Sequence, residues 1–442
     1  MNKPICLVTA PVATRSGYGA HSRDICRALI KLDKYDVKIW NVRWGNTPMN
    51  ALNKDDPNDS ILIKRLLKEP KLPSQPELHI HIVIPNEFQQ VGKFNIGITA
   101  GLEMTACPAE WLQGMNRMNM NIVPSTFVKE CMSNINYDVQ NEKTKEKQGV
   151  LRNERPIEVL FEGTDTNIFK KTNEFSTEFV DEMKNVKDSF NFLYVGHWLQ
   201  GELGEDRKDT GMLLKVFLET FKNQKNKPGL IMKTSGATLS ILDREAILHK
   251  INVIKANIKG DLPNIYLIHG DFSDDEMNGI YNHPKVKAHV TFTHGEGFGR
   301  PLLEASISQK PVIAPNWSGH TDFLPKGTAV LLNGTLENVK KGSVPDNFFI
   351  EGSQWFTVNY QGASMVLKDV YKNYKHYTLN AKKLGIVNKS KFSLDAMTQK
   401  LGKILDQYVP EFPKQVKLEL PKLKKVNSEE PQKIKLPKLK KI

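Results

Sequence analysis

Cysteine is scarce in this chain, and hydrophobic runs of membrane-spanning length are missing. Four cysteines occur among 442 residues without any C-x-x-C pair: Cys6, Cys26, Cys107 and Cys131. Scattered cysteines support neither a zinc site nor a disulfide framework, so we expect a reducing, cytoplasmic setting. The longest apolar runs have the length of strands, and a helix that crosses a bilayer needs about 20 apolar residues. We therefore expect no transmembrane segment.

Acidic residues are too few to balance the basic ones, and the excess is concentrated at one end. The net charge is +13, from 62 Lys and Arg against 49 Asp and Glu. Residues 414–442 hold ten lysines against three glutamates and contribute +7 of this charge. The motif Leu-Pro-Lys-Leu-Lys-Lys occurs there twice, at 420–425 and 436–441. Such a composition cannot build a core, so residues 411–442 are predicted to be a disordered basic tail.

Upstream of the tail, strand-length and helix-length patterns alternate, which is typical of an α/β fold. The length suffices for two such lobes. The charged segment 138–156 is predicted to be an irregular loop, and Ser273 with Glu276 forms the capping box of a helix. Strands are expected at 5–10, 37–42, 79–84, 94–99, 121–123, 190–195, 230–234, 265–269, 288–292 and 310–314.

The most informative segment is 295–305, Gly-Glu-Gly-Phe-Gly-Arg-Pro-Leu-Leu-Glu-Ala, between two expected strands. Gly297 and Gly299 allow close approach of a ligand or a positive φ angle, and Pro301 suits the first position of a helix, where its missing N–H would be unpaired. The free amides of that turn, together with the helix dipole, favour an anion. Glu304, expected in the first turn, can accept hydrogen bonds from a diol such as ribose, and Glu296 lies on the loop. The segment predicts a nucleotide-sugar site.

This segment resembles the signature of glycosyltransferase family 4, the retaining enzymes of GT-B fold. Both glutamates and nearly every residue between them match, and the Pro-Val-Ile-Ala and Ser-Gly segments at 311–314 and 318–319 follow. The resemblance covers about residues 4–408 and implies two Rossmann-like lobes that face each other across a cleft. It implies an acceptor-side lobe at 1–165, a nucleotide-sugar-binding lobe at 166–390 and a helix that crosses back at 391–410, before the tail at 411–442. Glu162 stands at the junction where the family usually has asparagine.

The resemblance also implies roles for individual residues. Lys208 and Arg207 would hold the leaving diphosphate, Glu296 would contact the sugar, and Glu103 would orient the acceptor or the sugar. A solvated loop at 207–208 and a purely structural pairing of Glu103 stay open. His197 stands where the family usually has an arginine. The expected donor-binding residues are Gly17, Gly19, His197, Asp271, Phe272, Gly297, Phe298, Gly299, Leu303 and Glu304.

The implied activity is transfer of a hexosyl or related glycosyl group from a nucleotide-diphosphate sugar to an undetermined acceptor, with retention. Neither a metal nor another cofactor is expected, since helix amides and basic side chains can hold the diphosphate, and the sequence contains no Asp-x-Asp pair. A nucleotide-sugar epimerase is disfavoured by the glutamate pair. A catalytically silent GT-B protein that binds nucleic acid or a partner through its tail stays open.

The sequence motifs do not identify the acceptor, and the tail offers the one indication of it. Its lysines could make weak electrostatic contact with nucleic acid or with an anionic membrane. A modified DNA base, a surface glycan and a lipid therefore remain alternative acceptors, and peripheral membrane attachment of a cytoplasmic protein remains open. A tail that only adds solubility is an equally good interpretation.

Overall fold

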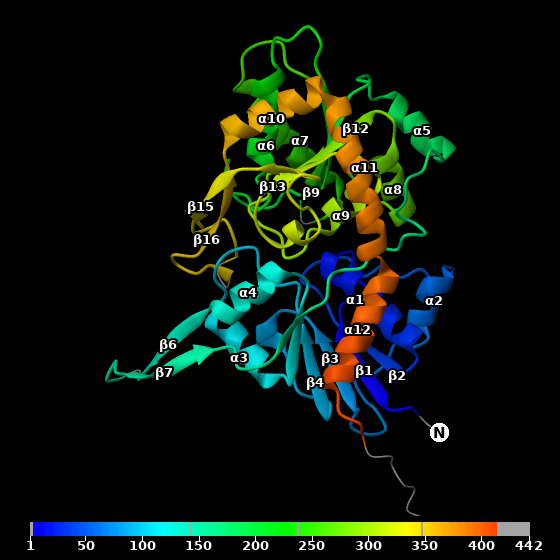
Figure 1. The fold of residues 1–442 in the computed structure, drawn as a ribbon, viewed down its shortest axis with the longest axis vertical. Helices are drawn as coiled ribbons and strands as arrows, with labels where there is room; N and C mark the ends of the chain where they lie inside the picture. The colour runs from blue at the N-terminus through cyan, green and yellow to red at the C-terminus, as the bar shows by residue number, and fades with distance from the viewer. Residues whose placement is uncertain (1–2, 142, 237, 346–347, 413–442) are drawn as a thin grey trace, which may run out of the picture. The chain divides into compact units, whose positions relative to one another are not determined.

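Two parallel six-stranded sheets form the framework of the computed structural model (Figure 1). The structure describes residues 3–141, 143–236, 238–345 and 348–412. The first sheet has the order β2-β1-β3-β4-β5-β8, and the second has the order β11-β10-β9-β12-β13-β14. The first consists of β1 (Ile5–Ala10), β2 (Asp36–Asn41), β3 (Leu78–Ile82), β4 (Phe94–Ile98), β5 (Met120–Val123) and β8 (Ile157–Val159). The second consists of β9 (Asn191–His197), β10 (Gly229–Ser235), β11 (Ile265–Ile268), β12 (Val286–Val290), β13 (Val312–Pro315) and β14 (Val330–Leu332).

Helices connect the parallel strands, as this topology requires. In the first lobe they are α1 (Gly17–Leu32), α2 (Pro57–Ile63), the 3₁₀ turn η1 (Pro85–Glu87), α3 (Ala109–Arg117) and α4 (Thr126–Asn134). In the second they are α5 (Thr177–Lys184), α6 (Thr210–Phe221), α7 (Ile241–Ala256), α8 (Asp274–Asn282), α9 (Arg300–Ile307) and the 3₁₀ turn η2 (Gly319–Asp322). The helices α10 (Tyr360–Lys372), α11 (Tyr374–Lys391) and α12 (Leu394–Tyr408) follow.

The carboxyl ends of the two sheets face each other. The loop after β5 meets the loop after β12, where the Ser125 hydroxyl donates to the Gly297 carbonyl over 2.6 Å. The backbone N–H of Thr126 also donates to the carboxylate of Asp322, over 2.8 Å. Because parallel sheets bind ligands beyond the carboxyl ends of their strands, this edge is where a site is expected.

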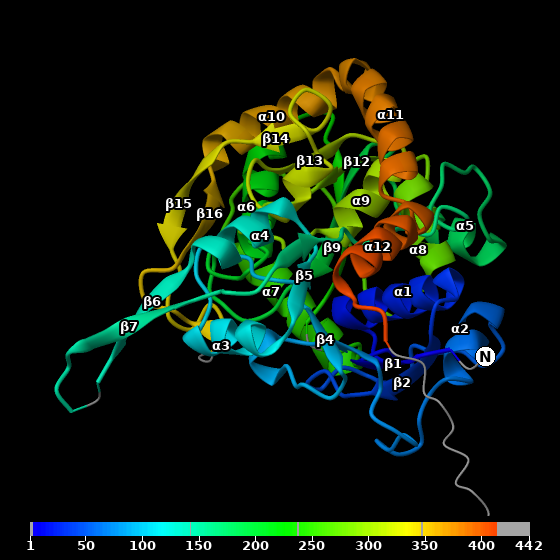
Figure 2. The same cartoon turned by 60° about the horizontal axis from the view of Figure 1, so that its bottom comes forward.

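Helix α12 belongs to the core of the first lobe although it comes last in the described chain. Figures 1 and 2 show it beside α1, and Met397, Leu401 and Leu405 are buried with the strands of the first sheet. Thr164 exchanges backbone hydrogen bonds with Phe392 and Leu394 where the chain crosses, each of 2.9 Å. A Cβ atom on the neighbouring Gly163 would lie 2.7 Å from the Leu394 Cα, so a glycine is required at this crossing.

A second connection between the lobes comes from the hairpin of β15 (Gly334–Asn338) and β16 (Gln354–Val358). The backbone N–H of Thr105 donates to the Gln354 carbonyl over 2.8 Å, and the Gln354 N–H donates to the Thr105 hydroxyl over 2.9 Å. The ring of Phe348 lies edge-on to Trp111, with centroids 5.7 Å apart. The hairpin and the loop that it carries therefore hold the second lobe to α3.

The expected strands are confirmed within a few residues, and so is the capping box of Ser273 and Glu276 at the start of α8. The prediction of an irregular loop at 138–156 is wrong. The structure has an antiparallel hairpin there, β6 (Asn136–Gln140) with β7 (Lys147–Arg152), which extends away from the first lobe (Figure 1). Nearly all of its residues are exposed, so it shows no alternation of apolar and polar residues from which strands could be recognised.

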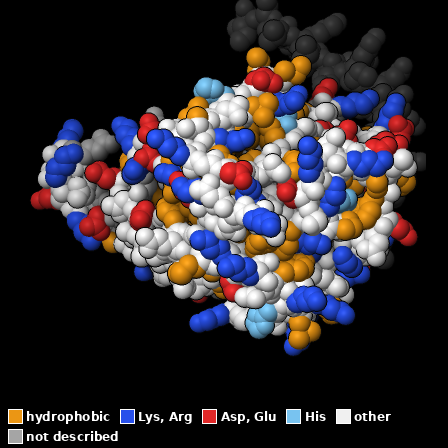
Figure 3. Space-filling view, turned by 90° about the horizontal axis from the view of Figure 1, so that it is seen from above, with side chains coloured by type: hydrophobic (Ala, Val, Ile, Leu, Met, Phe, Trp, Pro, Cys, Tyr) orange, Lys and Arg blue, Asp and Glu red, His pale blue; other side chains and the backbone are white. Residues whose placement is uncertain are grey.

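The surface of the second lobe carries dispersed positive charge. Figure 3 shows Lys and Arg side chains spread among neutral and hydrophobic ones on one face. No helix in the described residues combines the length and the apolar character needed to cross a membrane. The tail prediction lies at 411–442, of which residues 413–442 are outside the described residues.

Candidate functional site

The loop between β12 and α9 ends at a glycine with a positive φ angle. Gly299 caps α9 with φ of +93°, a conformation that side-chain-bearing residues rarely adopt. The helix begins at Arg300, so Pro301 is its second residue and Glu304 its fifth. The expectation that Glu304 lies in the first turn is therefore wrong, because the helix starts directly after Gly299.

Four charged side chains meet in front of this loop. The Lys208 Nζ lies 2.6 Å from the Glu296 Oε1 and 3.7 Å from the Glu103 Oε1, and Arg207 forms an ion pair with Glu103. Glu103 comes from the first lobe, after β4, and the other three come from the second lobe. The structure thus brings together all four residues that were predicted to be catalytic.

The backbone that carries Arg207 and Lys208 is fixed on both sides. The buried carboxylate of Asp206 accepts hydrogen bonds from the amides of Thr210, at 3.0 Å, and Gly211, at 3.3 Å, at the start of α6. The Arg207 carbonyl accepts from the backbone N–H of His294, which precedes the glycine loop, over 3.1 Å. The segment is therefore an ordered part of the site, contrary to the open alternative of a solvated loop.

The charges in this cluster keep Glu296 ionised. Burial alone would raise the pKa of Glu296, but Lys208 and Arg207 lie close enough to lower it below its usual value. Two cations and two carboxylates then balance each other. A phosphate group placed here would accept charge-assisted hydrogen bonds from Lys208 and Arg207 in exchange for the carboxylates.

Glycines of this loop bring the two lobes into backbone contact. A Cβ atom on Gly297 would lie 2.0 Å from the Ala100 carbonyl oxygen, and one on Gly295 would lie 2.3 Å from that of Glu103. Gly319 is equally restricted, because its Cβ would lie 2.0 Å from the Gly297 carbonyl oxygen. Close approach therefore explains Gly295 and Gly297, whereas backbone conformation explains Gly299.

Arg300 connects the lobes beside this loop. Its guanidinium bonds the Glu304 carboxylate over 2.9 Å and the Asp24 carboxylate of α1 over 2.6 Å. The Tyr281 hydroxyl donates to the other Glu304 oxygen over 3.2 Å. Burial raises the pKa of Glu304 to about 7, although Arg300 opposes the shift. Glu304 can therefore exchange a proton near neutral pH.

Glu162 is a second buried carboxyl with a raised pKa. Burial raises the pKa of Glu162 from 4.5 to about 7, against the effect of Arg300. Between these values the folded protein binds more protons than the unfolded chain, so this group lowers the free energy of unfolding as the pH rises through that window. Above pH 7 the loss reaches roughly 3 kcal/mol, from 1.36 kcal/mol per pKa unit.

We expect Glu162→Gln to stabilise the protein at pH 8 and to have a much smaller effect at pH 4.5, where the glutamate is protonated in the folded protein and about half protonated in the unfolded chain. Urea denaturation of both proteins at the two pH values measures the difference, and the other titrating groups are common to both. A stability difference that does not change with pH would contradict the burial of an ionisable carboxyl at this position.

The donor-binding residues predicted at the other strand ends lie at the end of β9 and after β11 of the second sheet. His197 ends β9, and its Nδ1 is 3.2 Å from the Ser235 hydroxyl at the end of β10. Asp271 follows β11 and pairs with Arg15 of the first lobe, 3.3 Å away. Phe272 lies under Lys233, whose Nζ is 4.8 Å from the ring centroid. These residues line up along the carboxyl edge of the second sheet.

The four remaining predicted residues offer a ligand no accessible side chain, because two are glycines and two have buried side chains. Gly17 is the exposed first residue of α1, and Gly19 is packed against Thr14. Phe298 and Leu303 are buried in the core of the second lobe, 2% and 0% exposed. The side chain of Leu303 therefore serves packing, and Phe298 can offer a ligand only its backbone.

Solved structures resemble this fold along nearly their whole length. Anabaena HepE, solved in complex with UDP and glucose, has a TM-score of 0.56 and 12% identity, with 91% of this chain and 100% of that chain covered. A glycosyltransferase from Rickettsia africae has a TM-score of 0.58 and 14% identity, with coverage of 92% and 99%. Sucrose-phosphate synthase from Thermosynechococcus elongatus has a TM-score of 0.58 and 13% identity, also with coverage of 92% and 99%.

The fold is GT-B. Two Rossmann-like lobes, predicted from the sequence, are confirmed by the two sheets and by these structures. No protein-family model matches the chain, and no curated protein matches it significantly. Identities of 12% to 14% indicate the GT-B fold alone.

Sequence reasoning missed three basic residues of this candidate site, Arg15, Lys233 and Arg300. The Lys233 Nζ donates to the Gly270 carbonyl over 2.9 Å, so it shapes the loop that holds Asp271 and Phe272. The sequence could have indicated two of them. Arg15 follows β1 closely and Lys233 lies near the end of β10, and parallel strands present ligand-binding residues at their carboxyl ends. Among the described residues, no group of three or more His, Cys, Asp or Glu side chains is arranged as metal ligands would be.

Proposed function

We propose that this protein is a glycosyltransferase that moves a sugar from a nucleotide-diphosphate sugar to an acceptor, with retention and without a metal ion. The observation that carries the proposal is the ion pair of Lys208 with Glu296, joined by Arg207 and Glu103, in front of the N-terminus of α9. The pair lies where the carboxyl ends of both sheets meet. Cations at this position can stabilise the charge that develops on a leaving diphosphate.

Each residue has one role in the proposed reaction. Lys208 and Arg207 bind the diphosphate oxygens, and the amides at the start of α9 add further donors. Glu296 orients the sugar, and Glu304 accepts hydrogen bonds from the ribose hydroxyls. The acceptor oxygen bonds to the anomeric carbon on the face from which the diphosphate departs. The bond from that carbon to the phosphate oxygen breaks, and the acceptor proton passes to the diphosphate.

Uridine donors are the first to test. Anabaena HepE was solved with UDP-glucose, and the E. coli trehalose-6-phosphate enzyme with UDP-2-fluoro glucose. Both share the GT-B fold with this chain at TM-scores of 0.56 and 0.55. We therefore place UDP-glucose first and propose a hexosyl group as the transferred unit.

We expect release of UDP from UDP-glucose, slow with water and faster with a suitable acceptor, and unchanged by EDTA, because side-chain cations replace the metal. A panel of labelled uridine, adenosine and guanosine diphosphate sugars, each with and without chelator, measures this. Loss of activity in EDTA and recovery with manganese would contradict the metal-free reaction. A changed sugar without nucleotide release would indicate an epimerase. No turnover with any donor, together with tight salt-sensitive DNA binding, would favour a silent binding protein.

A further inference from the structure

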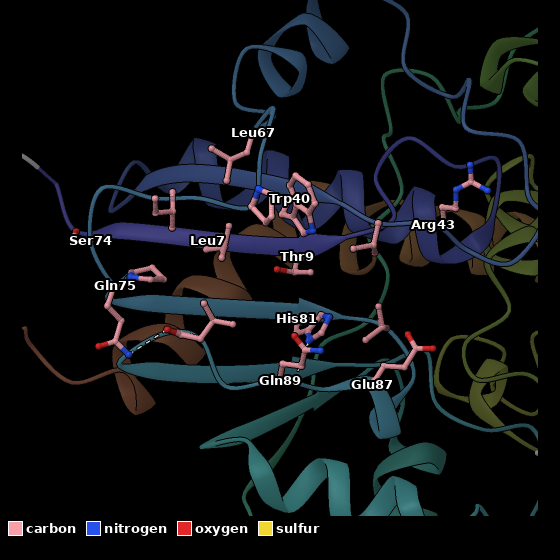
Figure 4. Close-up of a pocket in the computed structure, with 16 residues that line it drawn as sticks. Leu7, Thr9, Trp40, Arg43, Leu67, Ser74, Gln75, His81, Glu87 and Gln89 are labelled. Carbon is pink, nitrogen blue, oxygen red and sulfur yellow. Dashed lines mark hydrogen bonds between the residues drawn. The ribbon is translucent and has the colours of Figure 1, made fainter.

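A cavity of about 720 Å³ lies on the first lobe, outside the site described above. Its size falls within the range of about 300–1,000 Å³ that is typical of small-molecule pockets. Figure 4 shows it along the strands of the first sheet. It is lined by Leu7, Thr9, Trp40, Val42, Arg43, Leu67, Pro70, Leu72, Ser74, Gln75, Pro76, His81, Val83, Glu87, Gln89 and Val91.

The alternation of side chains along the strands creates this cavity. In β1, Cys6 and Val8 point into the core that α1 and α12 cover, so Leu7 and Thr9 point to the opposite face. That face is bordered by chain segments 67–76 and 87–91. The floor is a rigid sheet, and the walls are loops.

A hydrogen-bond donor is fixed in the middle of the cavity. The Nδ1 of His81 accepts the backbone N–H of Gln89 over 3.1 Å. Burial lowers the pKa of His81 to about 3, so the imidazole is neutral and carries its single proton on Nε2. His81 therefore offers an N–H to a molecule in the cavity, next to the Thr9 hydroxyl, which is 2.9 Å from the His79 Nε2.

The lining has no net charge. Arg43 and Glu87 are its only charged residues, and Figure 4 shows both at the end toward which the strands run. Most of the other lining residues are aliphatic, aromatic or proline, among them Leu7, Trp40 and Leu67. A lining of this kind suits an uncharged molecule with an apolar body and a few hydrogen-bonding groups, and it does not suit a polyanion.

A chain of contacts joins the charged end of the cavity to the candidate site. Trp44, next to Arg43, stacks on Tyr18 with ring centroids 3.9 Å apart. The Tyr18 hydroxyl lies 2.8 Å from the Thr99 hydroxyl and accepts the backbone N–H of Ala100 over 3.1 Å. Ala100 is the residue whose carbonyl touches Gly297, beside Glu296. The Arg43 end is therefore the end of the cavity that these contacts link to Glu296, and an acceptor that reaches the reacting groups would leave the cavity there.

We propose that this cavity holds the apolar body of an uncharged amphipathic acceptor, with the reacting hydroxyl directed past Arg43 toward Glu103 and Glu296. The acceptor role rests on the proposed glycosyltransferase function, whereas occupation of the cavity does not. The cavity selects the acceptor by its apolar body, and His81 and Thr9 select it by hydrogen bonds.

The test uses the full-length protein and two uncharged probes, octyl β-glucoside and 4-nitrophenyl β-glucoside, each titrated calorimetrically without a nucleotide sugar. We expect both to bind at millimolar concentration or below. Gln89→Trp places a bulky ring at an exposed lining position and should weaken binding about tenfold or more, equivalent to 1.4 kcal/mol. His81→Phe should weaken it as well, through loss of the Nε2 donor. Lys68→Trp is the matched control, another exposed position that lies outside the lining, and should bind like the wild type.

Binding that is equal in the wild type and in Gln89→Trp would overturn the proposal, and so would failure of both probes to bind. Displacement of the probes by single-stranded DNA would overturn the uncharged class of occupant. A separate assay of UDP release from UDP-glucose tests the glycosyltransferase function. Probe binding that depends on Gln89 in a protein without donor turnover would keep the cavity as a ligand site and would overturn its acceptor role.

Discussion

Replacing Lys208 with alanine is expected to lower the rate of glycosyl transfer about a hundredfold or more, the usual cost of losing one preorganised group that stabilises developing charge. Lys208 is the cation closest to Glu296, at 2.6 Å, and its side chain is only 12% exposed. Water cannot easily replace it there, so its charge is little screened. Steady-state UDP release and transfer, measured at saturating donor, give the change in kcat.

Lys225→Ala removes the same charge from an exposed position of the second lobe and should leave the rate unchanged. Lys208→Arg keeps the charge with a different geometry and should retain more activity than the alanine variant. A wild-type rate in Lys208→Ala would show that the ion pair with Glu296 has no part in the reaction.

Replacing Gly297 with alanine is expected to reduce both the stability of the protein and the rate of transfer. The new Cβ would lie 2.0 Å from the Ala100 carbonyl oxygen, and backbone on both sides of the contact leaves little room to adjust. We expect a loss of about 1–3 kcal/mol of stability from overpacking. We also expect about a hundredfold slower transfer, because a shift of one ångström between reacting groups has that effect.

Denaturation and transfer assays of the same preparation separate the two effects. Gly149→Ala is the control, since a Cβ atom there meets nothing within 4 Å. Full stability together with full activity in Gly297→Ala would mean that the lobes do not approach this closely during turnover. Low activity in a variant of normal stability would indicate that the contact between Gly297 and Ala100 serves to align the two lobes.

The sequence was sufficient to predict the strands and the glycine loop for simple physical reasons. Strands of a buried parallel sheet are runs of apolar residues, as in β1 and β9, and such runs are visible without a structure. The loop at 295–299 is a motif of consecutive residues and can be recognised locally, although its contacts with Glu103 and Ala100 of the first lobe cannot. Lys208 and Glu103 were predicted from a resemblance, and in the structure Lys208 lies between Glu103 and Glu296.

Contacts between distant segments could not be predicted in the same way. Nothing near Arg300 in the chain indicates that it bonds Asp24, 276 positions away. The exposed hairpin β6–β7 buries no face, so its strands lack a hydrophobic period. The cavity beside His81 depends on the course of the segment 67–76 over the sheet. In the sequence, His79 and His81 show only that they share one face of a strand.

The pairing of Lys208 and Arg207 with Glu296 and Glu103 has a consequence for ligand selection. The two carboxylates act as built-in counter-ions, so the two cations are already neutralised before any ligand arrives. A simple anion such as inorganic phosphate gains little by displacing them, because each new contact replaces an existing one. Only a ligand that also engages the α9 amides and the sugar and nucleoside positions gains enough to displace both carboxylates together. The site would then discriminate among anions by the free energy needed to displace both carboxylates, and it would not need a net positive charge to attract them.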